Sequence, residues 1–291
     1  MKVTYKINLL LAVLLFFGFQ VKGKPSEGRF SVSPELVFHD LDETLNKIIE
    51  IVENKEKGAY LRFGDGDINL ARGEYDSYQR PCRKLSVEMR EALSLSGQNI
   101  VKTLPLHCPE LSEDTKFMPE ATKTDISWVN QFLKKVAPFW GKKITDVYSP
   151  WILPFMAVAH EQRCVEFLKF LKGKNCCLFV GNKNIPEIIK NVLFGEGCVF
   201  VPTPDRNSYL EIDRIERECL ENIPKNDEYK IIIVSMGCSG RVLEKRLFKK
   251  MENIFLFDFG SLMDAFCGWK TRAWMEYSGF DGKKFMENYF L

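Results

Sequence analysis

The chain has 291 residues, of which 45% are hydrophobic and 27% are charged. This composition is that of a globular protein and excludes a largely disordered or fibrous chain. The 41 lysine and arginine residues nearly balance the 39 acidic residues, so the sequence carries no electrostatic signature of nucleic-acid binding. We therefore expect no nucleic-acid partner.

The first 23 residues have the pattern of a secretory signal. Lys2 and Lys6 precede an apolar stretch over residues 7–19, and Gly23 follows it closely. The stretch is shorter than the roughly 20 residues that span a bilayer, which favours a cleaved signal peptide over a retained signal anchor. The protein is therefore expected in the ER or Golgi lumen or outside the cell. The alternative is a single-pass type II membrane protein, associated with the membrane through residues 7–21.

A linker and one domain are expected to follow the signal. Residues 24–39 have a linker-like sequence, and residues 40–291 would form the domain. In its first half, the spacing of apolar residues predicts four helices, the second with Ser86 as N-cap, and two strands. The helices are predicted over 41–52, 86–95, 125–136 and 155–171, and the strands over 59–63 and 99–104.

The second half of the domain has a more regular rhythm. Continuous apolar runs predict strands over 176–180, 198–201, 230–235 and 254–257, with helices over 185–194, 212–223 and 241–250 between them. Such strands indicate an α/β fold whose mostly parallel sheet is covered by helices on both faces. Ligands bind such sheets at the carboxyl ends of the strands. The site is therefore sought just after Phe63, Val180, Ser235 and Phe257.

Glycines and acids follow the first predicted strand, in the segment Arg62-Phe63-Gly64-Asp65-Gly66-Asp67. The two glycines let the backbone turn sharply, and Asp65 and Asp67 supply two carboxylates one residue apart. Mg²⁺ or Mn²⁺ is commonly held by one or two carboxylates together with phosphate oxygens. The planar fork of Arg62 suits a diphosphate. The alternative is an ordinary turn that caps the next helix.

Small residues separate a strand from a helix in two later segments, Gly181-Asn182-Lys183-Asn184 and Ser235-Met236-Gly237-Cys238-Ser239-Gly240-Arg241. Backbone N–H groups at a helix start favour anions, so both segments are candidate phosphate cradles. The alternative for the first is a strand-to-helix turn with an asparagine cap. The second has neither the spacing of a nucleophile elbow nor that of a Walker loop.

The last strand leads into Asp258-Phe259-Gly260-Ser261-Leu262-Met263-Asp264. Asp258 or Asp264 would serve as a base or a second metal carboxylate, with a helix cap as the alternative. Acids, glycines and small polar residues thus follow four strands of one sheet. This convergence favours a nucleotide-diphosphate site.

The nine cysteines form no CxxC pair, so a structural zinc site is poorly supported. We expect mostly buried thiols, with one or two disulfides among Cys82, Cys108, Cys238 and Cys267, and at least one cysteine outside any intrachain pair because the number is odd. Cys238 would be a nucleophile at a helix start only with a histidine partner.

Three of these segments resemble the motifs of the GT-D glycosyltransferases, a family first described as a domain of unknown function in bacterial adhesin glycosylation. The family patterns are R-[FY]-G-D-G-E, S-x-G-x-[SA]-x-x-x-[LI] and D-x-G, and they correspond in the same order to residues 62–67, 235–243 and 258–260. The resemblance covers roughly residues 41–274. It implies a Rossmann-like fold, a nucleotide-sugar donor such as UDP-glucose, and a divalent metal.

By position, the resemblance assigns Asp65 and Asp67 to the metal and the diphosphate. The sequence departs from the family at Asp67, where the family has Glu, and at Ser261, where bacterial members often have His; Asp264 would take over any role of that His. We expect Asp67 and Asp264 to be catalytic. Residues from all four segments are expected to bind the donor: Arg62, Gly64, Gly66, Gly181, Asn182, Ser235, Gly237, Ser239, Arg241 and Asp258.

The sequence therefore predicts a glycosyltransferase of the hexosyltransferase class that depends on Mn²⁺ or Mg²⁺. It would move a sugar from a nucleotide-diphosphate donor, with a UDP-sugar favoured, to a glycan or glycoprotein. Two alternatives remain at this point. One is a phosphate-ester hydrolase, and the other is a non-catalytic lumenal binding protein with a degenerate transferase fold.

Overall fold

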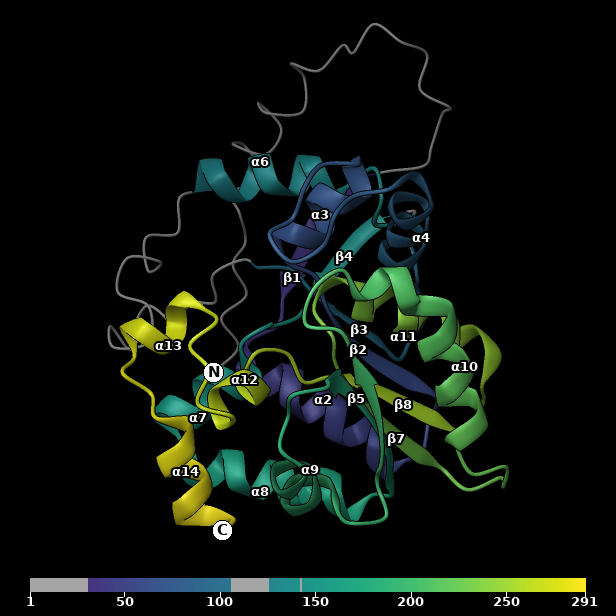
Figure 1. The fold of residues 1–291 in the computed structure, drawn as a ribbon. Helices are drawn as coiled ribbons and strands as arrows, with labels where there is room; N and C mark the ends of the chain where they lie inside the picture. Colours follow the sequence, from purple (N-terminus) through teal and green to yellow (C-terminus); the bar gives the residue numbers. More distant parts are fainter. Residues whose placement is uncertain (1–30, 106–125, 142) are drawn as a thin grey trace, which may run out of the picture.

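A computed structural model describes residues 31–105, 126–141 and 143–291 (Figure 1). The apolar stretch over residues 7–21 lies outside these ranges. Within them, no helix is both long and apolar enough to cross a bilayer.

Six parallel strands form the central sheet, in the order β3-β2-β8-β7-β5-β6. The strands are β2 (Gly58–Arg62), β3 (Ile100–Thr103), β5 (Cys176–Asn182), β6 (Val199–Thr203), β7 (Lys230–Ser235) and β8 (Ile254–Asp258). Isoleucine and valine fill the interior of β7, and residues 231–234 have no exposed surface. A strand buried on both faces needs such an unbroken apolar run, so the predicted parallel α/β sheet is confirmed.

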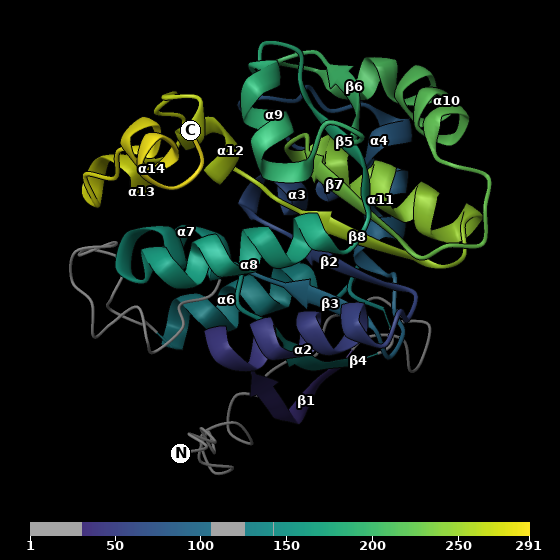
Figure 2. The ribbon, with the colours of Figure 1, turned by 90° about the horizontal axis from the view of Figure 1, so that it is seen from below.

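Helices cover both faces of this sheet (Figure 2). One face packs against α2 (Leu41–Glu53), α7 (Ile152–Ala159), α8 (Glu161–Gly173) and α9 (Glu187–Phe194). The other packs against α3 (Asp65–Arg72), α4 (Arg83–Leu93), α6 (Ile126–Val136), α10 (Ile212–Asn222) and α11 (Cys238–Lys250). Alternate strand residues serve the two cores: Phe255 and Phe257 face the first, and Ile254 and Leu256 face the second. This alternation is the two-residue period of a strand.

The C-terminal helices α12 (Leu262–Phe266), α13 (Ala273–Tyr277) and α14 (Gly282–Tyr289) follow β8 and cluster to one side of the sheet (Figure 2). Aromatic residues tie this cluster to the first core. Phe266 stacks on Phe285 with ring centroids 5.4 Å apart, and it contacts Phe259 just beyond β8. The segment after β8 is thereby held beside the carboxyl ends of the strands.

The structure corrects the prediction of a linker over residues 24–39. Ser31–Phe38 form strand β1, which pairs in parallel with β4 (Lys143–Val147) in a second, two-stranded sheet. Neither strand is predicted by the apolar pattern. A bridge between Thr103 and Tyr148 connects this small sheet to β3.

Several element boundaries also differ from the prediction. The helix predicted over 155–171 is two helices, because the backbone leaves the helical region at His160. Helix α4 begins at Arg83 with Cys82, not Ser86, as its N-cap. Strand β6 continues through Pro202 to Thr203, which an edge strand tolerates because its outer N–H groups need no partner. A short 3₁₀ helix, η1 (Ser208–Glu211), precedes α10.

The cysteines within the described ranges are all free thiols: Cys82, Cys164, Cys176, Cys177, Cys198, Cys219, Cys238 and Cys267. Six of them are buried, as expected. The predicted disulfide among Cys82, Cys238 and Cys267 is therefore wrong, and Cys108 lies outside the described residues.

Candidate active site

A cavity of about 540 Å³ opens at the carboxyl ends of β2, β5, β7 and β8. All twelve predicted site residues other than Gly181 line it: Arg62, Gly64, Asp65, Gly66, Asp67, Asn182, Ser235, Gly237, Ser239, Arg241, Asp258 and Asp264. Gly181 is not among the lining residues. The order of the strands brings these distant segments to one edge, as the general rule for parallel sheets predicts.

The two acids after β2 point in different directions. Helix α3 begins at Asp65, with Gly64 as its N-cap. The Gly64 N–H group donates to Asp67 Oδ2 at 2.7 Å, and Asp67 is only 4% exposed, whereas Asp65 is exposed. Residues two apart on a helix do not face each other, so these carboxylates do not form a close pair.

Asp67 retains one free acceptor. Its Oδ1 is buried and has no hydrogen-bond partner. Burial raises the pKa of Asp67 to about 6, although the charge of Arg241 and the Gly64 N–H bond act in the opposite direction. Gly66 leaves room for the Asp76 side chain, because a Cβ at this position would collide with it. Asp67 Oδ1 is thus a polar atom of the cavity wall without a ligand of its own.

Arg62 lies inside this acid-rich cavity without a carboxylate partner among the residues that the structure describes. Its Nη1 donates at 3.4 Å to the carbonyl oxygen of Phe259, and its buried Nε has no acceptor. Gly260 makes room for the guanidinium group, since a Cβ at this position would overlap it. Gly260 also has a φ of 64°, a conformation that favours glycine. Arg62 is therefore a preorganised cation that can accept an anion.

Arg241, in contrast, forms ion pairs with buried acids. Its Nη1 lies 2.6 Å from Asp258 Oδ2 and 2.9 Å from Glu244 Oε2, and the three side chains are 6% exposed or less. Burial raises the pKa of Glu244 well above its usual range. Arg241 lines the cavity as predicted, but its ion pairs suit it to holding Asp258 and Glu244 in place. The sequence prediction did not include Glu244. Its position three residues after Arg241 on a helix could have indicated the ion pair, because residues at this spacing are neighbours.

The start of α11 forms an open cradle. Gly237 is the N-cap of this 13-residue helix, with a φ of 58°, and a Cβ built on it meets no atom within 4 Å. The free N–H groups of a helix start attract anions, so this part of the prediction agrees with the geometry. Ser235 donates to the carbonyl oxygen of Gly260 at 3.0 Å and joins the cradle to the loop after β8.

Ser239 and Cys238 are occupied by contacts within the protein, so neither side chain is free to bind a ligand. The Ser239 hydroxyl donates to Gln79 Oε1 at 2.9 Å and is 1% exposed. Gln79 Oε1 also accepts from the Tyr209 N–H group, so it joins three segments of the cavity wall. Burial, reinforced by Asp67 and Asp76, raises the pKa of Cys238 well above its usual range. A thiolate nucleophile at Cys238 is thereby disfavoured.

The cradle predicted after Val180 does not form. Strand β5 extends to Asn182, and helix α9 begins only at Glu187 after Pro186. The Asn182 side chain donates to Asp205 Oδ1 and accepts from the Asn184 N–H group, both at 2.9 Å. This is the alternative interpretation of a turn-forming asparagine. Gly181 is required for packing, because a Cβ there would lie 2.6 Å from the Phe179 ring.

The loop after β8 supplies the opposite wall. Thr271 donates to Asp264 Oδ2 at 2.6 Å, and burial raises the pKa of Asp264 while this hydrogen bond lowers it. Trp269 and Arg272, basic and aromatic groups that the sequence places after the last predicted strand, also line this wall. Sequence reasoning missed several further residues of the wall, which come from loops and from α13 and belong to no motif: Asp76, Tyr78, Gln79, Trp151, Asp205 and Trp274. Their residue types suit a binding site, but only the fold shows that these residues lie together.

A metal ion fits this site only in part. Within the described ranges, no group of three or more His, Cys, Asp or Glu side chains is placed to hold one. The orphaned Asp67 Oδ1 and the exposed Asp65 carboxylate remain as oxygen donors. They suit a hard cation that takes one or two protein oxygens and completes its shell with water and phosphate oxygens.

Comparisons with known proteins agree with this arrangement. The family model for the glycosyltransferase GT-D fold matches residues 60–286. The structure resembles that of a glycosyltransferase (DUF1792) from Streptococcus sanguinis, with a TM-score of 0.59 and 21% identity over 79% of this chain and 82% of that one. It equally resembles a domain of unknown function 1792 with a distinct glycosyltransferase fold, with a TM-score of 0.58 and 23% identity over 79% and 80%. Among curated proteins, no match was found.

Proposed function

Because the chain belongs to the glycosyltransferase GT-D fold family, we propose that its cavity binds a nucleoside-diphosphate sugar, with UDP as the favoured nucleotide, and that the sugar passes to a hydroxyl group of a glycan or glycoprotein. Membership of this family favours transfer over the hydrolase and the non-catalytic binding protein. The observation that carries the proposal is Arg62, whose guanidinium lies in the cavity without a carboxylate partner among the described residues and has a buried Nε with no acceptor there.

Arg62 and the α11 cradle would receive the diphosphate together. A guanidinium binds phosphate oxygens through two parallel N–H groups, and the open space above Gly237 leads to the N–H groups at the helix start. Both are held in place before the donor arrives, by Gly260 and by the Ser235 hydrogen bond. Preorganised donors of this kind stabilise the charge that develops on a leaving diphosphate.

Asp264 is the proposed base for the acceptor. Thr271 occupies Oδ2, so Oδ1 is the atom that would take the proton of the acceptor hydroxyl. The acceptor oxygen then bonds to the anomeric carbon of the sugar, and the bond from that carbon to the diphosphate oxygen breaks. The raised pKa of Asp264 makes its carboxylate a stronger base than an exposed aspartate.

Asp67 Oδ1 would hold Mn²⁺ or Mg²⁺ beside the diphosphate, with water and phosphate oxygens completing the shell, because Asp65 faces outward. Bound there, the cation would neutralise charge on the leaving group as a Lewis acid. The N-terminal signal pattern supports a lumenal or secreted location, where the acceptor would be a glycan or glycoprotein of the secretory pathway.

Titration calorimetry with UDP tests the donor site. We expect the purified protein to bind UDP more tightly with Mn²⁺ than with EDTA. Arg62→Gln should weaken UDP binding at least tenfold, or about 1.4 kcal/mol, in both conditions, whereas Asp67→Asn should remove the effect of the metal. Lys183→Gln, which removes a nearby exposed cation, is the matched control. UDP binding that is unaffected by Arg62→Gln would contradict the proposed site.

A further inference from the structure

Two arginines lie over the ring of Tyr78. Tyr78 and Arg272 line the cavity, whereas Arg206 lies outside its lining. The guanidinium carbon of Arg272 is 4.6 Å from the ring centroid, and that of Arg206 is 5.6 Å away. Tyr78 belongs to the connection between α3 and α4, Arg206 to the one between β6 and η1, and Arg272 to the one between α12 and α13. We refer to Tyr78, Arg206 and Arg272 as the arginine–tyrosine cluster.

Backbone hydrogen bonds hold this cluster in position. The Asn207 N–H group donates to the carbonyl oxygen of Tyr78 at 2.9 Å, and the Arg80 N–H group donates to Asn207 Oδ1 at 2.9 Å. The Tyr78 hydroxyl donates to the carbonyl oxygen of Thr271 at 3.5 Å. Three loops thus converge on one ring. An arginine stacked on an aromatic ring has already lost part of its conformational freedom, so it binds a ligand at lower entropic cost.

Two acids lie close to the arginines without forming a salt bridge to them: Asp205 directly precedes Arg206 in the chain, and Asp264 interacts with Arg272. Within the described residues neither arginine forms an ion pair, whereas Arg214, Arg241 and Arg246 are each paired with carboxylates. Arg272 influences the nearby Asp264 electrostatically but forms no ion pair with it, and the Asp264 carboxylate is bonded to Thr271. Both guanidinium groups are exposed and lie near one ring, so a bound oxyanion would neutralise positive charge there.

The cluster lies beside Asp264, the proposed base, because the Tyr78 hydroxyl bonds to Thr271 and Thr271 bonds to Asp264. Arg272 directly follows Thr271, which orients Asp264. Arg62 and the Gly237 cradle, which are proposed to bind the diphosphate, lie at the ends of other strands, β2 and β7. The half-buried Trp151 and Trp269 line the same cavity and offer apolar surfaces for a sugar ring.

We propose that the arginine–tyrosine cluster binds a carboxylate or another oxyanion on the acceptor, so that the acceptor is an acidic glycan. This inference rests on the proposed transferase function. The planar guanidinium of Arg272 would bind the oxyanion through two N–H groups, with Arg206 adding charge at the entrance and Tyr78 holding both side chains. The acidic sugar would then bring a neighbouring hydroxyl group to Asp264.

The test is binding of oligosaccharides of equal length but different charge, measured with UDP and Mn²⁺ present. The probes are hyaluronan octasaccharide, which carries carboxylates, chondroitin sulfate octasaccharide, which adds sulfates, and neutral maltooctaose. At least one acidic chain should bind the wild-type protein at least tenfold more tightly than maltooctaose, and comparison of the two acidic chains identifies the preferred anion. This binding should weaken with rising salt.

Variants connect the effect to the cluster. Arg206→Gln/Arg272→Gln should lower the affinity for the acidic chain at least tenfold without changing UDP affinity. Tyr78→Leu should weaken binding of the acidic chain without any change of charge, whereas Lys270→Gln, the neighbouring charge control, should not.

Equal affinity for acidic and neutral chains, absence of glycan binding, or unchanged binding by the double arginine variant would overturn the proposal. Loss of UDP affinity in the double variant would also overturn it and assign the cluster to the donor. Failure of the wild-type protein to bind UDP would instead contradict the proposed function, so the two failures are distinguishable.

Discussion

Arg241 holds the buried Asp258 carboxylate, which would otherwise lack a counter-charge. Removing one partner of a buried ion pair commonly costs about 3–5 kcal/mol, because the remaining charge has neither water nor a counter-ion. We therefore expect Arg241→Met to lower the free energy of unfolding by about 3–5 kcal/mol, measured by urea denaturation at pH 7. Arg217→Met, at an exposed arginine of α10, should change it by about 0.5 kcal/mol or less.

Glu244 provides the contrasting substitution in the same cluster. Burial raises its pKa well above the usual range, which favours the neutral carboxyl group. An amide then replaces it with little change in charge and still accepts from Arg241 Nη1. Glu244→Gln should cost about 1 kcal/mol or less. A loss as large as that of Arg241→Met would show that Glu244 is ionised.

Lys102 gives the fold a pH dependence. It is 7% exposed, its Nζ donates to the carbonyl oxygens of Leu93 and Trp140, and burial lowers its pKa to about 7. Between pH 7 and the ordinary lysine pKa, the unfolded chain binds a proton that the folded chain lacks, so the free energy of unfolding rises with pH. The slope can approach about 1.4 kcal/mol per pH unit.

Replacing Lys102 by methionine should remove this slope. The wild-type protein should therefore gain stability relative to Lys102→Met as the pH increases from 7 to 9, measured by urea denaturation at each pH. Lys169→Met, at an exposed lysine of α8, should follow the wild-type curve. A constant difference between wild type and Lys102→Met over this range would show that Lys102 keeps its proton in the folded protein.

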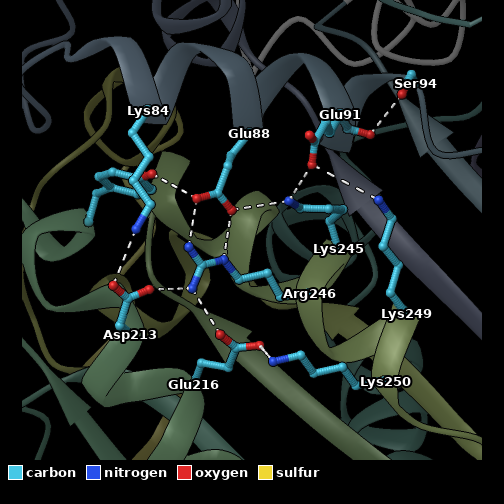
Figure 3. A network of polar contacts seen from close by, with 11 residues as sticks. Lys84, Glu88, Glu91, Ser94, Asp213, Glu216, Lys245, Arg246, Lys249 and Lys250 are labelled. Atoms are coloured by element: carbon cyan, nitrogen blue, oxygen red, sulfur yellow. Dashed lines mark hydrogen bonds and ion pairs between the residues drawn. The ribbon is translucent and has the colours of Figure 1, made fainter.

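At the scale of elements, ion pairs join three helices on one face of the sheet (Figure 3). Glu88 of α4 accepts from Arg246 Nε at 2.7 Å and Nη2 at 2.6 Å, and from the Tyr209 hydroxyl at 2.8 Å. Arg246 of α11 also bonds Asp213 and Glu216 of α10. The network connects α4, α10 and α11, and α11 carries the Gly237 cradle at its start.

Glu88 should make this network sensitive to acid. Burial alone would raise its pKa, but hydrogen bonds from Arg246, Tyr209 and Lys245 outweigh it and lower the pKa to about 2. The stabilisation is present above the ordinary glutamate pKa and is lost as the pH falls towards 2. Glu88→Gln should therefore cost about 2–4 kcal/mol at pH 7, and the difference from wild type should shrink below pH 4. Glu91→Gln, at an acid that is 47% exposed, should cost about 1 kcal/mol or less. Equal costs for the two variants at pH 7 would contradict a special role for Glu88.

The elements that sequence predicted well are those with their own apolar period. Strand β7 has the predicted bounds, and the α2 helix differs by one residue. Strands β1 and β4 depend on each other and have no continuous apolar run, so the period carried no signal for them. The break at His160 was hidden because apolar residues continue on both sides of it.

At the scale of the whole molecule, the strand order determines which motif residues lie together in the cavity. Sequence reasoning placed the cavity correctly because parallel strands end at one edge. It could not tell that Asp67 turns inward to cap Gly64 while Asp65 faces outward, or that the Arg241 charge is taken up by Asp258. Tyr78 and Arg272 belong to loops almost 200 residues apart along the chain, and only the folded molecule brings them together.

The small sheet allows the extent of the folded body to be tested. His39 Nε2 lies 2.9 Å from Asp146 Oδ1, and the His39 ring stacks on Tyr148 at 4.2 Å, so the end of β1 is tied to β4 by side chains as well as by strand pairing. A chain that begins at Asp40 loses these contacts, whereas one that begins at Lys24 keeps them. Each hydrogen bond contributes about 1 kcal/mol, so the shorter chain should be less stable by about 2 kcal/mol or more in urea denaturation. Equal stability of the two chains would show that β1 and His39 do not stabilise the folded body.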